Sequence, residues 1–414
     1  MALHTSTILS RTPAALLSYL STLPKSFSGH PILFALATST TGTESDLSSL
    51  VSHLTSISSQ SIGCLSAPAP HSPSHTWISC SIAVFDKRIV TPFRSTIPGR
   101  AAVQVGRWHA FRKKGDVVSP GQEAGLEENV NWDDVWNKNV EQKALPDELQ
   151  SLKPGDVNSV IFLSDSAPEG ISNSLSAFPH ATKLGLLASS TPFITGRPVT
   201  LFHNKNIYSS GAVGLALHGG SAPAVDAHFH GLQPVSSTLT VTNSEGNLVH
   251  TLDNLNPSKL LLDAIKKSGI QQEMVKEDDF YLGALGDGKL SQVYRIMSGD
   301  PSRGTMSLQS GAAPPEGTPV QLFYKPNSLI PHAPPLKPCY GRSLSFVTSP
   351  LDLLSEEIPE VPGVGVDDLR VINGAFLAAS ENGWVLSRSR GERKVEEPWR
   401  CIVEGGVADL RWSE

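Results

Sequence analysis

Apolar runs of strand length dominate the first part of the chain, and one clear helical pattern interrupts them. Residues 31–38 form a continuous apolar run, and residues 61–65 form a second, shorter one. Between them Thr43 is suited to an N-cap, and an apolar face at helical spacing follows over residues 47–54. A strand, a helix and a strand in this order predict a βαβ unit with a parallel strand pair.

Further segments with strand character follow this unit. They lie at residues 76–85, 101–111, 160–163, 183–188, 199–203 and 208–217. A doubly wound parallel sheet would not carry so many antiparallel strands. The sequence therefore predicts a mixed α/β (α+β) fold, in which parallel and antiparallel strands are flanked by helices.

A second strand-rich unit begins after residue 220. Residues 238–242 alternate as a strand does, and residues 245–246 are typical of a tight turn into a strand at residues 248–252. An Asn-Pro start and a glycine end predict a helix over residues 256–269. The later strands are expected at residues 280–285, 290–297, 305–308 and 320–324.

These patterns divide the chain into two strand-rich domains and a tail. The first domain covers residues 1–220 and contains an insertion at residues 112–154, and the second covers residues 221–330. Residues 331–414 form a proline-rich connector and a strand-rich tail, which is expected to complete the second domain. Two or three domains suit a chain of 414 residues.

The insertion differs from the rest of the first domain. It changes from basic to acidic along its length, and Trp132 and Trp136 share one face of a helix at this spacing. It has two interpretations. Either it is a surface excursion whose tryptophans fold back onto the domain, or it is a docking loop for a partner protein.

The first 28 residues also have two interpretations. No acidic residue occurs before Glu44, and serine and threonine are abundant, as in a mitochondrial transit peptide. By contrast, Thr12 as an N-cap, Pro13 at the first helical position and a leucine face over residues 16–20 predict a folded helix. We expect the folded helix and a cytoplasmic location, with a mitochondrial location as the alternative.

Charge and cysteine content narrow the classes of partner. The net charge of −6 does not favour a nucleic-acid partner, and the apolar runs are shorter than the ~20 residues of a membrane helix. The four cysteines are scattered without a CxxC pair, so neither a disulfide framework nor a zinc site is indicated. Glycine-rich phosphate loops are absent from the sequence, and no cofactor is expected.

Seven short motifs, taken in their order along the chain, resemble the FIST family. Three are similar to its N-terminal domain, at residues 61–66, 183–188 and 208–218, and four are similar to its domain junction and C-terminal domain, at residues 230–235, 252–257, 295–306 and 317–323. Family members often carry the module beside signalling domains or behind an F-box. No F-box is expected here, because the first predicted strand starts near residue 31. The resemblance implies an intracellular sensor that binds a small ligand, such as an amino acid.

We expect the ligand between the two domains, where the turn after residues 61–65 meets the end of the strand at residues 208–217 and the junction at residues 228–234. The candidate ligand-binding residues are Gly63, Cys64, Ser66, His218, His228 and His230. The turn would offer backbone N–H groups and a hydroxyl, the histidines would offer donors, and glycines would let a ligand approach the backbone. The competing interpretation is that these residues only build the domain interface.

No known catalytic motif is present, so the sequence favours binding over catalysis. The enzymatic alternative is a hydrolase that uses Cys64 as nucleophile or a metal held by His228 and His230. Asp165 at a strand end either points into a cleft or caps the following loop. A third alternative is an adaptor related to the F-box FIST receptors, which contacts its partner through residues 112–154.

Overall fold

The computed structural model describes residues 2–38, 43–69, 72, 77–97, 145–269, 280–300, 304–326, 342–349, 368–390, 394–395 and 397–412. The expected strand at residues 101–111, the pair Trp132 and Trp136, and the proline-rich connector lie outside the described residues. Strands predominate, and the sheets mix parallel and antiparallel pairs, which confirms the expected mixed α/β class.

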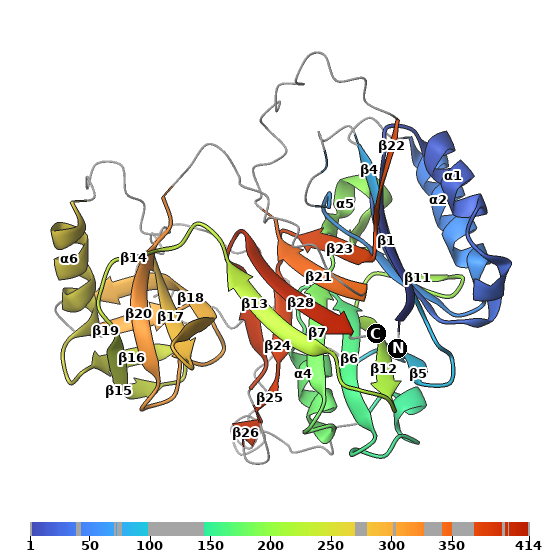
Figure 1. The fold of residues 1–414 in the computed structure, drawn as a ribbon. Helices are drawn as coiled ribbons and strands as arrows, with labels where there is room; N and C mark the ends of the chain where they lie inside the picture. The colour runs from blue at the N-terminus through green and yellow to red at the C-terminus, as the bar shows by residue number, and fades with distance from the viewer. Residues whose placement is uncertain are drawn as a thin grey trace, which may run out of the picture.

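Two stacked sheets with helices on both outer sides form the larger body, called the sandwich below (Figure 1). The first sheet contains, in spatial order, β11 (Asn206–Tyr208), β10 (Leu201–His203), β3 (Ser61–Leu65), β2 (Ile32–Ala37), β4 (Ile78–Phe85), β1 (Ala2–Ser10) and β22 (Leu369–Asn373). The second contains β27 (Trp399–Cys401), β24 (Trp384–Ser387), β7 (Thr182–Leu187), β6 (Val157–Ser164), β12 (Ala212–His218) and β5 (Val90–Ser95).

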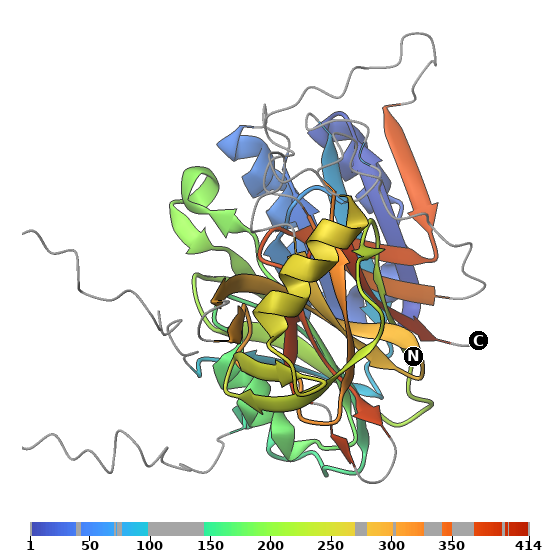
Figure 2. The same ribbon diagram turned by 90° about the vertical axis from the view of Figure 1, so that its left-hand side faces the viewer.

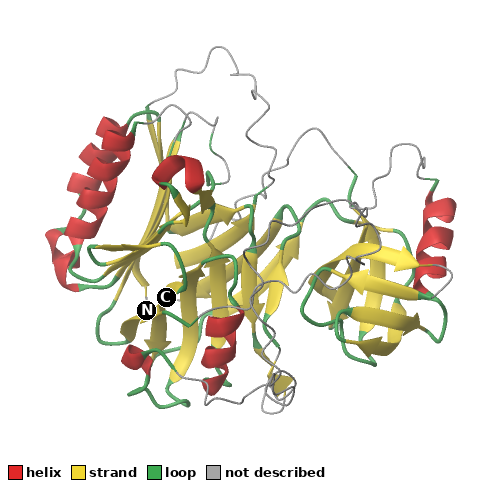
Figure 3. Ribbon diagram, turned by 180° about the vertical axis from the view of Figure 1, so that it is seen from behind, coloured by secondary structure: helices red, strands yellow, loops and turns green. Residues whose placement is uncertain are grey.

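The helices cover the outer face of each sheet. They are α1 (Pro13–Ser21) and α2 (Glu44–Ile57) on the first sheet, and α4 (Glu169–Ser174) on the second (Figure 3). Leu16 and Leu50 of the helices share one apolar cluster with Phe34 of β2, while Leu33 of β2 faces inward with Ile161 of β6. Alternate residues of β2 therefore face the two layers, as the period of a strand requires.

Local sequence signals position the two N-terminal helices as expected. The Thr12 hydroxyl accepts the Ala15 N–H at 3.2 Å at the start of α1. Thr43 and Asp46 form a reciprocal capping box at the start of α2. Both caps confirm the predicted helices, and the βαβ prediction is confirmed by the parallel pairing of β2 with β3.

The two sheets repeat one local arrangement. A parallel pair joined by a helix, β2–α2–β3 or β6–α4–β7, lies between two antiparallel neighbours, β4 and β10 in the first sheet and β12 and β24 in the second. Even the glycine positions correspond. Phe34 lies opposite Gly63, and Phe162 lies opposite Gly185.

The sequence did not predict β1, which pairs with β4 and β22 inside the first sheet. Its serines and threonines hide the usual alternation of apolar and polar residues. Thr7 donates to the Ala375 carbonyl and accepts the Leu377 N–H, both at 2.9 Å, so its hydroxyl is satisfied between two layers. Backbone groups of another sheet thus allow this polar segment to be buried.

Strands of the tail belong to the sandwich, whereas the sequence suggested that the tail completes the second domain. β22 pairs with β1, and β24 pairs with β7. A third sheet contains β13 (Ala224–Phe229), β28 (Gly406–Trp412), β21 (Arg342–Thr348) and β23 (Ala375–Ser380). A strand-rich tail was expected, whereas β13 and β21 were not predicted, and hydrophobic periodicity does not specify the partner of a strand.

The smaller body, called the barrel below, is a closed β-structure within residues 233–326 (Figure 2). Its strands in order are β14 (Gln233–Pro234), β20 (Pro319–Tyr324), β15 (Leu239–Glu245), β16 (Leu248–Leu252), β19 (Thr305–Leu308), β18 (Lys289–Asp300) and β17 (Phe280–Gly286). Pairing of β17 with β20 closes it. The predicted helix is α6 (Pro257–Ser268), capped by Asn256. Among the described helices, none has the length and apolarity needed to cross a membrane.

Candidate functional site

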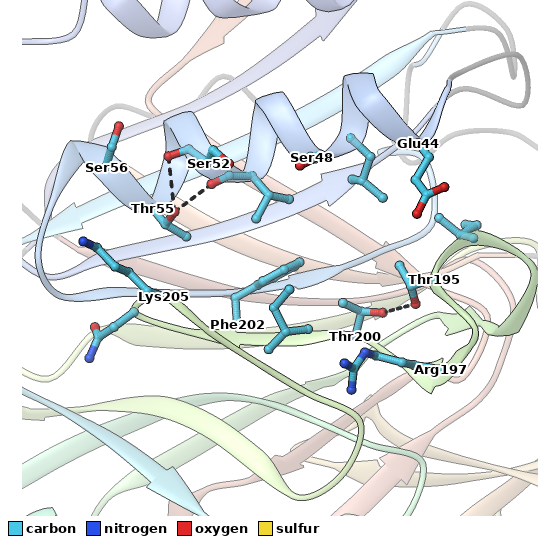
Figure 4. Close-up of a pocket in the computed structure, with 15 residues that line it drawn as sticks. Glu44, Ser48, Ser52, Thr55, Ser56, Thr195, Arg197, Thr200, Phe202 and Lys205 are labelled. Atoms are coloured by element: carbon cyan, nitrogen blue, oxygen red, sulfur yellow. Dashed lines mark hydrogen bonds between the residues drawn. The ribbon is translucent and has the colours of Figure 1, made fainter.

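A pocket of about 620 Å³ lies on the outer face of the first sheet, between α2 and the hairpin of β10 and β11 (Figure 4). Its size is within the usual range of small-molecule sites, ~300–1,000 Å³. We call it the groove. Its lining residues are Glu44, Leu47, Ser48, Val51, Ser52, Thr55, Ser56, Ile194, Thr195, Arg197, Thr200, Phe202, Asn204, Lys205 and Ile207.

The helical wall of the groove carries a stripe of hydroxyl groups. Ser48, Ser52 and Ser56 recur every fourth residue along α2, so they share one face of the helix. The buried face of the same helix is apolar, with Leu50 and Leu54 at 1 % and 0 % exposure. The exposed serines therefore offer donors and acceptors to a molecule in the groove.

The opposite wall carries Arg197, which a network of threonines holds in place. The buried Thr200 hydroxyl lies 2.8 Å from that of Thr191 and 2.7 Å from that of Thr195. Thr191 also donates to the Arg197 carbonyl at 3.0 Å. The short helix α5 (Pro192–Thr195) ends at Gly196, whose φ of 70° turns the chain into β9 (Arg197–Val199). The Thr191 hydroxyl, which is itself bonded to Thr200, thus fixes the backbone from which the guanidinium projects.

Lys205 occupies the two-residue turn between β10 and β11, and Asn204 anchors this turn. Asn204 has a φ of 57°, a left-handed conformation that asparagine tolerates better than most residues. Its side-chain oxygen accepts the Ser61 N–H at 3.1 Å, and its own N–H donates to the Ser61 carbonyl at 2.6 Å. The hairpin is therefore fastened to the start of β3, and Lys205 projects from a rigid turn.

The charges of the groove are separated along its length. Figure 4 shows Arg197 and Lys205 at opposite ends with the Phe202 ring between them, and Glu44 at the Arg197 end. Phe202 is 2 % exposed and forms an apolar floor. Among the residues that the structure describes, the side chains of these three charged residues form no ion pair. One end of the groove thus offers a negative and a positive side chain, and the other end offers a second positive side chain.

The residues singled out from the sequence lie elsewhere. Cys64 is fully buried between the two sheets, where desolvation raises the pKa of its thiol and the negative charge of Glu381 raises it further. A thiol in this environment stays protonated near neutral pH. Cys64 therefore lies in the core, out of contact with any ligand that enters from solvent.

The space beside the glycines that were expected to expose the backbone is filled by other side chains of the protein. A Cβ added at Gly63 would lie 2.4 Å from the Phe34 ring, and one at Gly185 would lie 2.2 Å from the Phe162 ring. Both positions accommodate aromatic side chains of the neighbouring strand, and no space is left there for a ligand. This corrects the expectation that these glycines admit a bound molecule.

The structure does not bring Ser66 and His218 together. The Ser189 N–H donates to the Leu65 carbonyl, which puts the carboxyl ends of β3 and β7 side by side. β12 runs antiparallel to β6 and places His218 at the other end, opposite Val157. The two ends are separated by six residues of strand, roughly 20 Å. His218 bonds to the Thr91 hydroxyl at 3.1 Å instead.

His228 and His230 lie at the end of β13, near the junction with the barrel. The His228 Nε2 is 3.1 Å from the Asp226 carboxylate and 3.8 Å from that of Asp409. Within the described ranges, no group of three His, Cys, Asp or Glu residues could hold a metal ion. Asp165 caps a loop, because its carboxylate accepts the N–H groups of Ala167 and Gly211.

Two features of the sequence are typical of the walls of such a groove. One is the serine stripe on α2, which is unusual because serine favours helix ends over helix interiors. The other is the Asn204-Lys205 turn, which presents a cation on a rigid hairpin. Neither indicates that α2 and this hairpin meet, because β3 and β10 are far apart along the chain.

Comparison with known families identifies part of the chain. The model of the FIST N domain matches residues 127–255, which are 129 of the 414 residues. The chain therefore contains a FIST N domain, a type of domain that generally serves sensing and signal transduction. The matched range includes β6 to β16 and both Arg197 and Lys205, whereas α2 precedes it. No curated protein matches the chain.

Proposed function

We propose that this protein is an intracellular sensor that binds a small metabolite in the groove, and that acidic amino acids fit the groove best. The arrangement of Glu44, Arg197 and Lys205 around an apolar floor carries the proposal. The FIST N match, which includes Arg197 and Lys205 but not Glu44, supports a sensory role. The ligand site expected at Ser66 and the histidines is thereby replaced by the groove.

Each part of an acidic amino acid has a chemical counterpart in the groove. The ammonium group would face Glu44, and the α-carboxylate would accept the two parallel N–H donors of Arg197. The methylene groups would lie on Phe202, which is apolar and buried beneath the groove. The distal carboxylate would face the Lys205 end, from which the long lysine side chain would reach inward. The exposed serines of α2 add hydrogen bonds along one side.

The proposal also assigns the remaining parts of the chain. The part of the barrel after residue 255, where the FIST N match ends, would correspond to the C-terminal FIST domain, to which residues 295–306 and 317–323 are similar. The described residues of the groove all belong to the sandwich, so the barrel would take no part in holding the ligand. A cytoplasmic location suits a sensor of cellular metabolites.

A thermal-shift panel of the common amino acids and small dicarboxylates tests the proposal. A ligand at 100 times its dissociation constant stabilises the folded state by about 2.7 kcal/mol, which shifts the melting temperature measurably. We expect L-glutamate or L-aspartate to give the largest shift, and Lys205→Met to abolish the preference for them over neutral amino acids. A panel without any shift, or an unchanged preference in Lys205→Met, contradicts the proposal.

A further inference from the structure

The hairpin of β10 and β11 forms one wall of the groove and has two different faces. Phe202 and Ile207 lie opposite each other on the face that lines the groove. Leu201 and Tyr208 form the next pair, and the alternation of a strand turns their side chains to the inner face. There Leu201 is buried in the core between the two sheets, and Tyr208 packs against this core. The support of the inner face therefore sets the position of the groove wall.

Backbone hydrogen bonds give β11 little support of their own. The strand has three residues, and among the strands that the structure describes it pairs only with β10, at the edge of the first sheet. A short edge strand of this kind opens locally at a low cost in free energy unless side chains hold it. The side chain that packs beneath Tyr208 therefore determines how firmly the wall is held.

Arg94 of β5, the edge strand of the second sheet, supplies this support. Its Cζ lies 4.4 Å from the centre of the Tyr208 ring, which is the geometry of a cation–π contact. Its Nη2 donates to the Ser210 carbonyl at 2.6 Å, and its Nη1 donates to the Ala212 carbonyl at 2.9 Å. One guanidinium thus holds the last residue of β11, the turn that follows it and the first residue of β12.

The turn between β11 and β12 is adapted to this guanidinium. Gly211 has a φ of 79°, and its N–H donates to the Asp165 carboxylate at 2.6 Å. A Cβ added at Gly211 would lie 2.5 Å from the Nη1 of Arg94 and 2.3 Å from the Ser95 carbonyl. Glycine therefore allows both the left-handed backbone and the close approach of Arg94.

The burial of Arg94 has a cost in free energy. Burial lowers the pKa of its guanidinium, and its Nε is buried without a hydrogen-bond partner among the residues that the structure describes. Since an arginine stays charged, its contacts have to offset the loss of hydration. Contacts of a buried charge contribute little net stability but can specify one geometry.

We propose that Arg94 is a positioning residue of the ligand site, which fixes the hairpin wall and thereby sets the affinity of the groove for an acidic amino acid. This inference rests on the proposed function. Arg94 is not among the residues that line the groove, so it acts through Lys205 and Ile207 of the hairpin. Glu44 and Arg197 lie outside the hairpin. Loss of Arg94 should therefore impair recognition of the distal carboxylate more than recognition of the α-carboxylate.

Calorimetric titration of Arg94→Met with L-glutamate and with L-glutamine tests this role. The affinity for L-glutamate should fall about tenfold, and that for L-glutamine, which lacks the distal carboxylate, should fall less than about threefold. Tyr208→Leu should give the same result, while Tyr208→Phe, which keeps the ring, should bind both ligands as the unchanged protein does. Circular dichroism confirms that each variant is folded. Equal losses for the two ligands, or no loss, overturn the inference.

Hydrogen exchange provides a second test that needs no ligand. The amides of residues 201–208 should exchange about tenfold faster in Arg94→Met, while the amides of β2 keep their rates. Arg88→Met is the control, because it removes an arginine with an 81 % exposed side chain from the turn before β5. Unchanged exchange of the hairpin overturns the inference. Faster exchange without glutamate binding by the unchanged protein contradicts the proposed function, whereas it supports the anchoring of the hairpin by Arg94.

Discussion

Phe34 lies directly opposite Gly63 across the parallel pair of β2 and β3, and its ring occupies the space that a side chain at residue 63 would need. Phe162 and Gly185 repeat this relationship in the second sheet. The glycine in each parallel pair therefore serves packing under the covering helix. It explains why these two positions carry glycine without any ligand.

Substitution of either glycine should destabilise the protein. Gly63→Ala and Gly185→Ala place a methyl group against an aromatic ring, and overpacking of this kind costs about 1–3 kcal/mol. Urea unfolding measures the loss. Gly155→Ala is the matched control, because nothing lies within 4 Å of an added Cβ there and its φ is not positive. Equal stability of Gly63→Ala and Gly155→Ala would contradict the packing role.

The anchor of the β10–β11 hairpin can be tested by two substitutions at one position. Asn204→Ala loses the hydrogen bond to the Ser61 N–H and strains a left-handed backbone, so we expect a cost of about 1–3 kcal/mol. Asn204→Gly keeps the conformation and should lose only the hydrogen bond. The difference between the two free energies of unfolding gives the cost of the left-handed backbone at residue 204. A difference of zero would contradict this account of the turn.

The threonine network around Arg197 should affect both the stability of the protein and its affinity for the ligand. Thr200→Val keeps the shape of the buried side chain but removes its bonds to Thr191 and Thr195. We expect a loss of about 1–3 kcal/mol in stability, because two partner hydroxyls lose a bond. The affinity for L-glutamate should fall several-fold, since the loop with Arg197 is less well fixed. Calorimetric titration that gives an unchanged affinity would show that the network is not needed for binding.

Lys183 predicts a dependence of stability on pH. It is 4 % exposed on β7, and burial lowers the pKa of its amine to about 8, below the ordinary lysine value of about 10.4. The unfolded chain therefore binds more protons between these two values, and the contribution of Lys183 to stability rises with pH in that window.

Replacement of this lysine tests the effect directly. Lys183→Met should raise the free energy of unfolding at pH 7 by about 1–2 kcal/mol, a figure reduced for solvent screening. The gain should shrink as the pH rises from 8 towards 10. Lys289→Met, at an exposed site of the barrel, serves as control. A gain that is independent of pH would mean that apolar packing, and not the charge, causes it.

Much of the secondary structure was readable because local signals agree with the fold. The caps at Thr12, Thr43 and Asn256 and the turn before Leu248 all rest on interactions within a few residues. The mixed sheet class followed from the number of strands. The strand β1 could not be predicted, because its polar side chains are buried with their hydroxyls bonded to β23. The sheets to which the tail strands belong could not be predicted either, because their partner strands lie hundreds of residues away.

The groove could not be predicted from the sequence for the same reason. Glu44 and Lys205 lie far apart along the chain and line the same groove only because β10 pairs with β3 beside α2. The sequence instead drew attention to glycines and histidines that stand out by residue type. Gly63 stands out because it packs against Phe34, and Cys64 lies in the core beside it.

The most direct test of the account is a calorimetric titration of L-glutamate into the protein and into an Arg197→Gln, Lys205→Gln double variant. A Lys266→Gln, Lys267→Gln variant carries the same change in charge on exposed positions of α6 and serves as control. We predict saturable binding to the unchanged protein and to the control, and a loss of at least tenfold in affinity for the groove variant. Equal binding to all three proteins would contradict the assignment of the groove as the ligand site.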